Sequence, residues 1–102
     1  MENSSPSICI PRVFAEITRR NISDAFTKVL GEDCIERIDM IRKNKNNDSY
    51  QRVFIHFKYW PNNDRSVMLK DRLLNGQDIK VVYNEPWFWK CSASRVPKPV
   101  RR

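Results

Sequence analysis

The side chains best suited to binding a ligand lie in the stretch YQRVFIHFKYW, residues 50–60. The alternation of its apolar residues predicts a strand that buries Val53, Ile55 and Phe57. The opposite face would then carry Tyr50, Arg52, Phe54, His56 and Lys58. Flat rings beside cations can stack on nucleobases and neutralise phosphates, and each stacked base contributes about 1–3 kcal/mol.

A second aromatic group, Trp87, Phe88 and Trp89, follows Pro86 in the segment EPWFWKCSASR. In an extended strand the two indoles would face one way and Phe88 the other. One interpretation is that these rings cover apolar surface of the sheet, since large aromatic side chains are usually buried. The other is that at least one indole stays accessible and stacks on a base. Both interpretations remain open, because different rings can serve different roles.

Composition and charge narrow the class of protein. The chain has 102 residues, which predicts a single domain, and a formal net charge of +7 with a pI of about 9.7. Such a charge favours a polyanionic partner, although it also simply raises solubility. With two glycines in all, the sequence lacks the glycine-rich patterns of P-loop and dinucleotide-binding proteins.

The three cysteines, Cys9, Cys34 and Cys91, lie far apart, and His56 is the only histidine. A structural zinc site needs about four ligands at short spacings, so we expect neither a metal nor a cofactor. The odd number and wide spacing argue against a disulfide framework and favour a reducing, intracellular compartment. No apolar run is long enough for a transmembrane helix, and the N-terminal residues do not resemble a signal peptide. We therefore expect no membrane association.

The apolar patterns predict four strands and two helices. Strands are expected at 7–14, 34–43, 50–60 and 78–83, and helices at 18–31 and 65–74. The order β-α-β-β-α-β predicts an α+β, ferredoxin-like sandwich, with a four-stranded antiparallel sheet, both helices on one face and the other face open. Pro11 should mark a strand end or a bulge, because it cannot donate a ladder hydrogen bond.

This organisation divides the chain into four parts. We expect a disordered lead at 1–6, the domain at 7–83, an aromatic extension at 84–94 that packs on or extends the sheet, and a basic, flexible tail at 95–102. The other strands would add further side chains to the open face: Cys9, Arg37, Asp39, Ile41, Lys80 and Val82.

The third predicted strand resembles the octapeptide of the RNA recognition motif (RRM) family, [K/R]-G-[F/Y]-[G/A]-[F/Y]-V-x-[F/Y]. Phe54 falls on a base-stacking position and Phe57 on the buried final aromatic, while ICIPRV (8–13) lies where the family has its hexapeptide. The resemblance covers residues 7–83, and it implies an RRM-like sandwich that binds RNA on its open sheet face.

Several positions depart from the RRM pattern. Tyr50 replaces the opening basic residue, Gln51 the glycine, Arg52 the first stacking aromatic and Cys9 the aromatic of the hexapeptide. One of the three usual platform rings remains, at Phe54, although Arg52 can stack as a planar cation. A second resemblance, carried by RVFIHFKYW, NG..IKVVY and EPWFWKCSASR, is to small RRM-like viral proteins of giant DNA viruses.

We therefore expect single-stranded nucleic-acid binding, to RNA rather than DNA, by a monomer or weak homodimer. Bases would contact Tyr50, Arg52, Phe54 and His56, with Trp87 or Trp89 as further stacking rings. Phosphates would contact Arg12, Lys58, Lys80 and the basic tail.

Two other functions compete with this expectation. One is an RRM-like protein–protein interaction module in which the aromatic extension covers the sheet; the missing rings at Cys9 and Arg52 favour it. The other is a small acylphosphatase-like hydrolase, which would need a phosphate-cradling loop after the first strand. Arg12 is nearby, but the loop PRVFAEI contains no glycine, so we expect no enzymatic activity.

Overall fold

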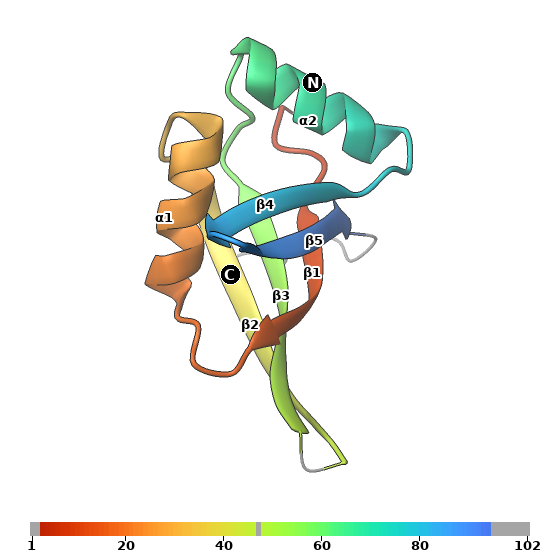
Figure 1. Cartoon of the computed structure of the whole chain (residues 1–102). Helices are drawn as coiled ribbons and strands as arrows, with labels where there is room; N and C mark the ends of the chain where they lie inside the picture. Colours follow the sequence, from red (N-terminus) through yellow and green to blue (C-terminus); the bar gives the residue numbers. More distant parts are fainter. Residues whose placement is uncertain (1–2, 47, 95–102) are drawn as a thin grey trace, which may run out of the picture.

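The computed structural model describes residues 3–46 and 48–94. Within these residues the chain is α+β, and Figure 1 shows the path of its elements. In chain order they are β1 (Ile8–Phe14), α1 (Arg19–Leu30), β2 (Ile35–Lys45), β3 (Asp48–Phe57), α2 (Asp64–Leu74), β4 (Ile79–Asn84) and β5 (Trp87–Ala93). Neither helix in the described part is long and apolar enough to cross a membrane.

The described strands form one sheet in the order β2-β3-β1-β5-β4, and each neighbouring pair is antiparallel. The expectation of four strands is therefore wrong by one. The aromatic segment forms β5, which turns back after β4 and lies between β4 and β1. The helix and strand order remains compatible with a ferredoxin-like α+β fold, since the additional strand leaves the order of the first six elements unchanged.

Local signals explain where α1 begins and ends. The Thr18 hydroxyl accepts a hydrogen bond from the backbone of Asn21, whose side chain accepts one from the backbone of Thr18, which completes a capping box. Gly31 ends the helix at φ 87°, a left-handed conformation that glycine adopts without strain. The helix buries Ile22, Phe26 and Leu30 against the sheet, and it confirms the helix expected at 18–31.

A single face of the sheet supplies most of the core. Ile8 and Ile10 of β1 pack beside Val53, Ile55 and Phe57 of β3, and all five side chains are fully buried. The other buried apolar residues of this core come from the end of β1, the helices, the connections and the last two strands: Val13, Ile22, Phe26, Leu30, Cys34, Trp60, Leu73, Ile79, Val81, Trp89 and Cys91. The predicted alternation of β3 is confirmed by this packing.

The N-terminal segment is held on the fold, so the expectation of a disordered lead is wrong for residues 3–6. Asn3 and Trp60 exchange hydrogen bonds, with the Trp60 backbone N–H donating to Asn3 O and Asn3 Nδ2 donating to Trp60 O. The Trp60 indole donates to the carbonyl of Pro6, which is itself buried. Residues 1–2 and the expected basic tail at 95–102 lie outside the described residues.

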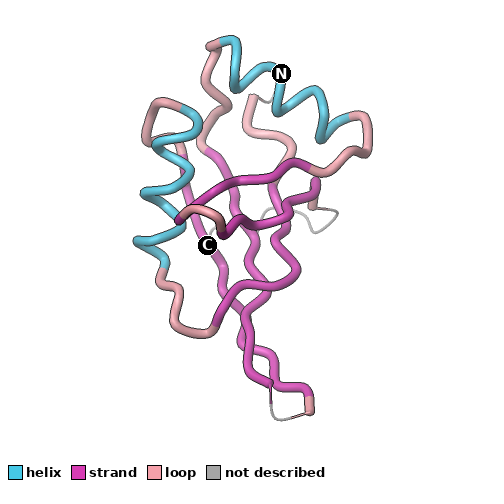
Figure 2. The backbone as a smooth tube through the Cα atoms, in the orientation of Figure 1, coloured by secondary structure: helices cyan, strands magenta, loops and turns pink. Residues whose placement is uncertain are grey.

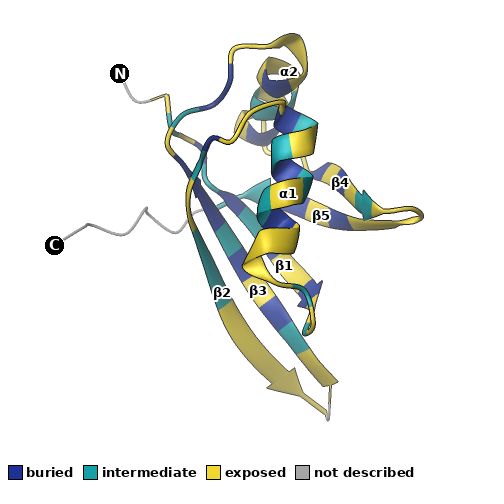
Figure 3. Cartoon of the chain, turned by 90° about the vertical axis from the view of Figure 1, so that its left-hand side faces the viewer, coloured by how far each residue is buried: buried dark blue, intermediate teal, exposed yellow. Residues whose placement is uncertain are grey.

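The sheet parts on one side of β1. Among the described residues, β1 pairs with β5 only at Ile8–Ala93 and Cys9–Ser92, whereas its ladder with β3 continues to Phe14–Tyr50. Figure 1 and the backbone trace in Figure 2 show β4 and β5 crossing β1 and β3 steeply, while the β2–β3 hairpin extends beyond the body. Figure 3 shows that the ends of β2 and β3 are exposed. A gap therefore opens between β1 and β5.

Candidate functional site

The face of the sheet away from the core carries a row of side chains from neighbouring strands. Phe54 of β3 lies opposite Cys9 of β1 and Asp39 of β2, and Cys9 lies opposite Ser92 of β5. Directly opposed residues of antiparallel strands share one face, so these four side chains form a platform. Phe54, Cys9 and Asp39 are expected there from the sequence, and Ser92 is an addition. The Phe54 ring is half-buried, which leaves part of its surface accessible.

A second row lies toward the tip of the β2–β3 hairpin. Tyr50 stands opposite Phe14 on one side and Lys43 on the other. The Arg12 guanidinium lies 4.3 Å from the centre of the Tyr50 ring and forms an ion pair with Asp48. Between the two rows, Arg52 is exposed. Rings and cations therefore alternate along β3, as the sequence predicts.

The gap between β1 and β5 forms a cleft of about 250 Å³, which we call the β1–β5 cleft. Among the residues that line it are Arg12, Phe14, Tyr50, Trp87, Phe88 and Trp89. The rings of Phe14 and Trp87 meet edge to face with centroids 6.0 Å apart. Both rings also remain open to solvent, with exposed fractions of 50% and 54%. The cleft thus presents aromatic surface next to an arginine.

The two indoles of the aromatic segment differ in burial. Trp89 is 3% exposed and lies between Tyr83, with centroids 4.2 Å apart, and Phe26, at 6.4 Å. Its ring faces are stacked within the core, so the expectation that it stacks on a base is wrong. Trp87 is half-exposed; an irregularity in the β4–β5 ladder between Val82 and Asn84 pairs it with Asn84 at the turn of the hairpin.

The indole N–H of Trp89 has no hydrogen-bond partner among the described residues, although it is buried. A buried donor without a partner costs about 1–3 kcal/mol, and such groups are uncommon in native structures. Because the Trp89 ring also lines the β1–β5 cleft, this unpaired donor belongs to the surroundings of the candidate site.

The open face continues onto the β4–β5 hairpin. Lys80 Nζ lies 4.9 Å from the centre of the Phe88 ring, and both residues are exposed. Across the hairpin, Phe88 pairs with Val82, and Val82 is also exposed. The predicted position of Lys80 on this face is therefore confirmed, and Phe88 adds a ring that the sequence-based site did not include.

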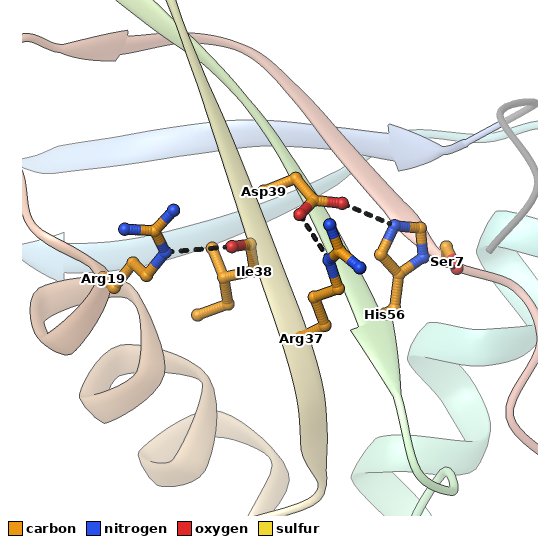
Figure 4. A network of polar contacts seen from close by, with 6 residues as sticks. All are labelled: Ser7, Arg19, Arg37, Ile38, Asp39 and His56. Atoms are coloured by element: carbon orange, nitrogen blue, oxygen red, sulfur yellow. Dashed lines mark hydrogen bonds and ion pairs between the residues drawn. The ribbon is translucent and has the colours of Figure 1, made fainter. Parts of the chain in front are cut away.

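His56 lies on the expected side of β3 but is only 1% exposed, so its assignment as a base contact is wrong. Ser7 Oγ lies 2.7 Å from His56 Nδ1, and Asp39 Oδ2 lies 3.4 Å from His56 Nε2. Figure 4 shows the Asp39 carboxylate between His56 and Arg37, whose Nε donates to it at 2.6 Å. The N-terminal segment and β2 together cover the imidazole.

The three side chains linked in this way, Ser7, His56 and Asp39, have the residue types of a nucleophilic triad. In this structure, however, the carboxylate also pairs with Arg37 and the imidazole is inaccessible to a substrate. A general base must reach the proton that it abstracts. We interpret the network as structural: it ties residue 7 to β3 and β2, and Arg19 adds a link from α1 through its bond to the Ile38 carbonyl.

The predicted phosphate contact Lys58 and the β3 residue Gln51 have different surroundings. Lys58 is exposed and follows β3, with its backbone N–H donating to the Cys34 carbonyl. Gln51, at the position of the RRM glycine, is buried and donates its side-chain amide to the carbonyls of Phe14, Ala15 and Ile17. It therefore fixes the connection between β1 and α1 beneath the cleft.

The thiols show no sign of nucleophilic activation. Burial raises the pKa of Cys34 to about 11 and that of Cys91 to about 12, and it also raises the pKa of the half-buried Cys9. A reactive cysteine requires a lowered pKa. No cluster of three or more histidine, cysteine or acidic residues suited to a metal occurs among the described residues.

Sequence reasoning missed Phe14 and Asp48. By strict alternation, Phe14 would share the core face with Ile8 and Ile10. A register shift between Ile10 and Val13 instead buries Val13 and sends Phe14 to the open side. The bulge expected at Pro11 is therefore confirmed, and it is the signal from which the position of Phe14 follows.

Comparison of the chain with protein-family models, curated proteins and solved structures finds no match.

Proposed function

We propose that this chain binds single-stranded nucleic acid, RNA in preference to DNA, on the open face of its sheet. The observation that carries the proposal is the alternation of rings and cations along β3, where Tyr50, Arg52 and Phe54 share a face that neither helix covers. Such a surface stacks on bases of any sequence and neutralises the backbone beside them. The resemblance of β3 to the RRM octapeptide supports RNA as the polymer.

Each group has a defined role in this proposal. Phe54 provides the principal stacking surface, and Arg52 stacks through its planar guanidinium or pairs with a phosphate. Lys58 and Lys80 contact the backbone on either side of the platform; both are exposed. The proposed function is binding without turnover, because the thiols have raised pKa values and His56 is buried.

The test is a titration of fluorescently labelled single-stranded RNA with the wild type and Phe54→Ala. Removing the ring should weaken binding by about 5- to 150-fold, which corresponds to ~1–3 kcal/mol for one stacked base. Met68→Ala is the matched control, because Met68 is an exposed apolar residue on α2. Single-stranded DNA of the same sequence tests the preference for RNA.

Two results would contradict the proposal. Absence of binding by the wild type at low salt would exclude the function. If Phe54→Ala and Met68→Ala both keep the wild-type affinity, the nucleic acid does not bind on the sheet face.

A protein-interaction module is the second candidate, favoured by the apolar residues exposed around the same face: Phe14, Ile41, Val82, Trp87 and Phe88. Contiguous exposed apolar surface often marks a protein interface. Partners that remain bound after nuclease treatment of a pulldown, and that are lost in Phe88→Ala, would support this function. Light scattering tests the variant in which the partner is a second copy of the chain.

A further inference from the structure

The β1–β5 cleft has features that a general stacking platform does not require. It is a concave site between two strands of one sheet, and it exists because β1 and β5 separate after Cys9–Ser92. Its volume of about 250 Å³ falls just below the ~300–1,000 Å³ typical of pockets for drug-sized ligands. A single flat ring system is therefore the appropriate size of occupant.

The walls of the cleft suit a flat, polarisable group. Phe14 and Trp87 are each about half-exposed, and their rings contact one another edge to face. Aromatic walls attract other rings by stacking or by edge contacts, beyond the effect of burying apolar area. An aliphatic side chain would gain the burial but not the stacking.

The cleft also offers a cation. At its rim, Arg12 lies over Tyr50 and pairs with Asp48, and both charged side chains of this pair are mostly exposed. Exposed ion pairs contribute little, so a phosphate can replace Asp48 as the partner of Arg12.

The cleft is continuous with the platform through Tyr50. This residue lies on the same strand and face as Phe54, four residues away, which is about 13 Å along a β-strand. A single-stranded nucleic acid that stacks on Phe54 can therefore extend to the rim of the cleft. The charge of the rim and the aromatic walls together match a nucleotide, which has both an anionic group and a flat ring.

We propose that the β1–β5 cleft binds one unstacked nucleobase of the strand that crosses the sheet, with Trp87 and Phe14 against the ring and Arg12 on the adjacent phosphate. This inference rests on the proposed function, and it assigns to one nucleotide a site separate from Phe54. It predicts that one position of a bound oligonucleotide depends on Trp87, while another depends on Phe54.

The experiment uses a set of short RNA oligonucleotides of one length, each with a single abasic site at a different position. Affinities are measured for the wild type, Trp87→Ala, Trp87→Phe and Phe54→Ala. In the wild type, loss of the base that occupies the cleft should weaken binding about tenfold. In Trp87→Ala the same abasic site should have less than about a twofold effect, whereas Trp87→Phe, which keeps a ring, and Phe54→Ala should retain the dependence.

Intrinsic fluorescence provides a measurement on the unmodified wild type. Trp60 and Trp89 are 2% and 3% exposed, so Trp87 is the tryptophan that an oligonucleotide can reach among the described residues. Saturating oligonucleotide should quench part of the emission, and Trp87→Phe should remove that quenching. Circular dichroism verifies that each variant is folded.

The outcomes separate the two proposals. If the wild type binds no oligonucleotide, the proposed function fails, and the cleft assignment fails with it. If the wild type binds and Phe54→Ala weakens it, but Trp87→Ala shows the wild-type abasic profile and Trp87 emission does not change, the proposed function stands and the cleft assignment is overturned. Should Trp87→Ala fail to fold, the wild-type quenching and its loss in Trp87→Phe decide the matter.

Discussion

The imidazole of His56 connects three segments that are distant in the sequence. It contacts the Ser7 hydroxyl on one side and the Asp39 carboxylate on the other, and it is almost inaccessible to solvent. Removing one member of a buried polar network leaves the remaining groups without partners. The contribution of His56 should therefore be to stability and not to binding.

For this reason His56→Ala should lower the free energy of unfolding by about 1–3 kcal/mol. The oligonucleotide affinity of the folded variant should stay within about twofold of wild type, because the ring cannot be reached by a base. Urea denaturation followed by circular dichroism measures the first quantity, and a binding titration measures the second. If His56→Ala has normal stability but strongly reduced binding, His56 contacts the nucleic acid and the prediction is wrong.

The buried thiols predict a loss of stability in alkali. Burial raises the pKa of Cys91 from 9.0 to about 12, so the folded state keeps a proton that the unfolded state releases. This contribution is fully present below pH 9.0 and is lost as the pH rises toward about 12. Denaturation curves between pH 7 and pH 11 should show the free energy of unfolding falling more steeply in the wild type than in Cys91→Ala. Equal slopes would contradict a buried, protonated thiol.

For single residues, the sequence predicted the face of the sheet on which a side chain lies better than it predicted whether that side chain is buried. Phe54, Arg52 and Lys80 lie on the open face as the alternation requires. His56 and Trp89 are buried because segments distant in the sequence, residue 7 in one case and Phe26 in the other, pack on them. Alternation along one strand gives the face on which a residue lies, but not what covers it.

The bulge in β1 determines the composition of the site at the scale of elements. It places Arg12 and Phe14 at the edge of the cleft, with Arg12 paired to Asp48 at the start of β3. The carboxylate competes with any phosphate for the guanidinium. Asp48 should therefore weaken the binding of an anionic ligand.

Asp48→Asn should raise oligonucleotide affinity by about two- to fivefold, since an exposed ion pair contributes only about 0–1 kcal/mol. Its thermal stability should change little. Asp24→Asn is the control, because it removes the same charge from an exposed pair with Arg20 on α1. If both variants raise affinity equally, the effect is one of net charge and Arg12 has no particular role.

Apolar periodicity predicted both helices and four of the strands, because that signal is local. Thr18 and Gly31 mark the ends of α1, and the alternation of Val53, Ile55 and Phe57 marks β3. The fifth strand was not predicted as a separate element, since its place between β4 and β1 depends on pairing with residues 8 and 9, far away in the sequence. The β1–β5 cleft could not be predicted for the same reason, because its position depends on where the pairing of β1 with β5 stops.

For the whole molecule, the net charge of +7 should make binding strongly dependent on salt. If Arg12, Arg52, Lys58 and Lys80 each neutralise one phosphate, the logarithm of the association constant should fall with a slope of about −2.8 against the logarithm of the salt concentration. Affinity would then fall roughly 50-fold between 50 and 200 mM salt. Titrations at four salt concentrations measure this slope.

Replacing one of these cations should reduce the slope by about 0.7. Lys80→Gln is suitable because Lys80 is exposed on the open face, and Arg65→Gln on α2 provides a cation away from that face. A salt slope near zero in the wild type would mean that the phosphate backbone does not contribute, and the proposed nucleic-acid function would lose its main source of affinity.

The sparse pairing between β1 and β5 has a consequence for motion. In the described part of the chain β5 pairs with β1 at two residue positions. The β4–β5 hairpin is otherwise held by packing, since Ile79, Val81, Trp89 and Cys91 are buried in the core. Segments with few backbone bonds to their neighbours open locally at a lower free energy than the whole fold. Amide hydrogen exchange along β5 should therefore be faster than along β3, which pairs with both of its neighbours over most of its length. A base bound between β1 and β5 would join the two strands and slow that exchange, so occupancy of one small cleft would be measurable along an entire strand.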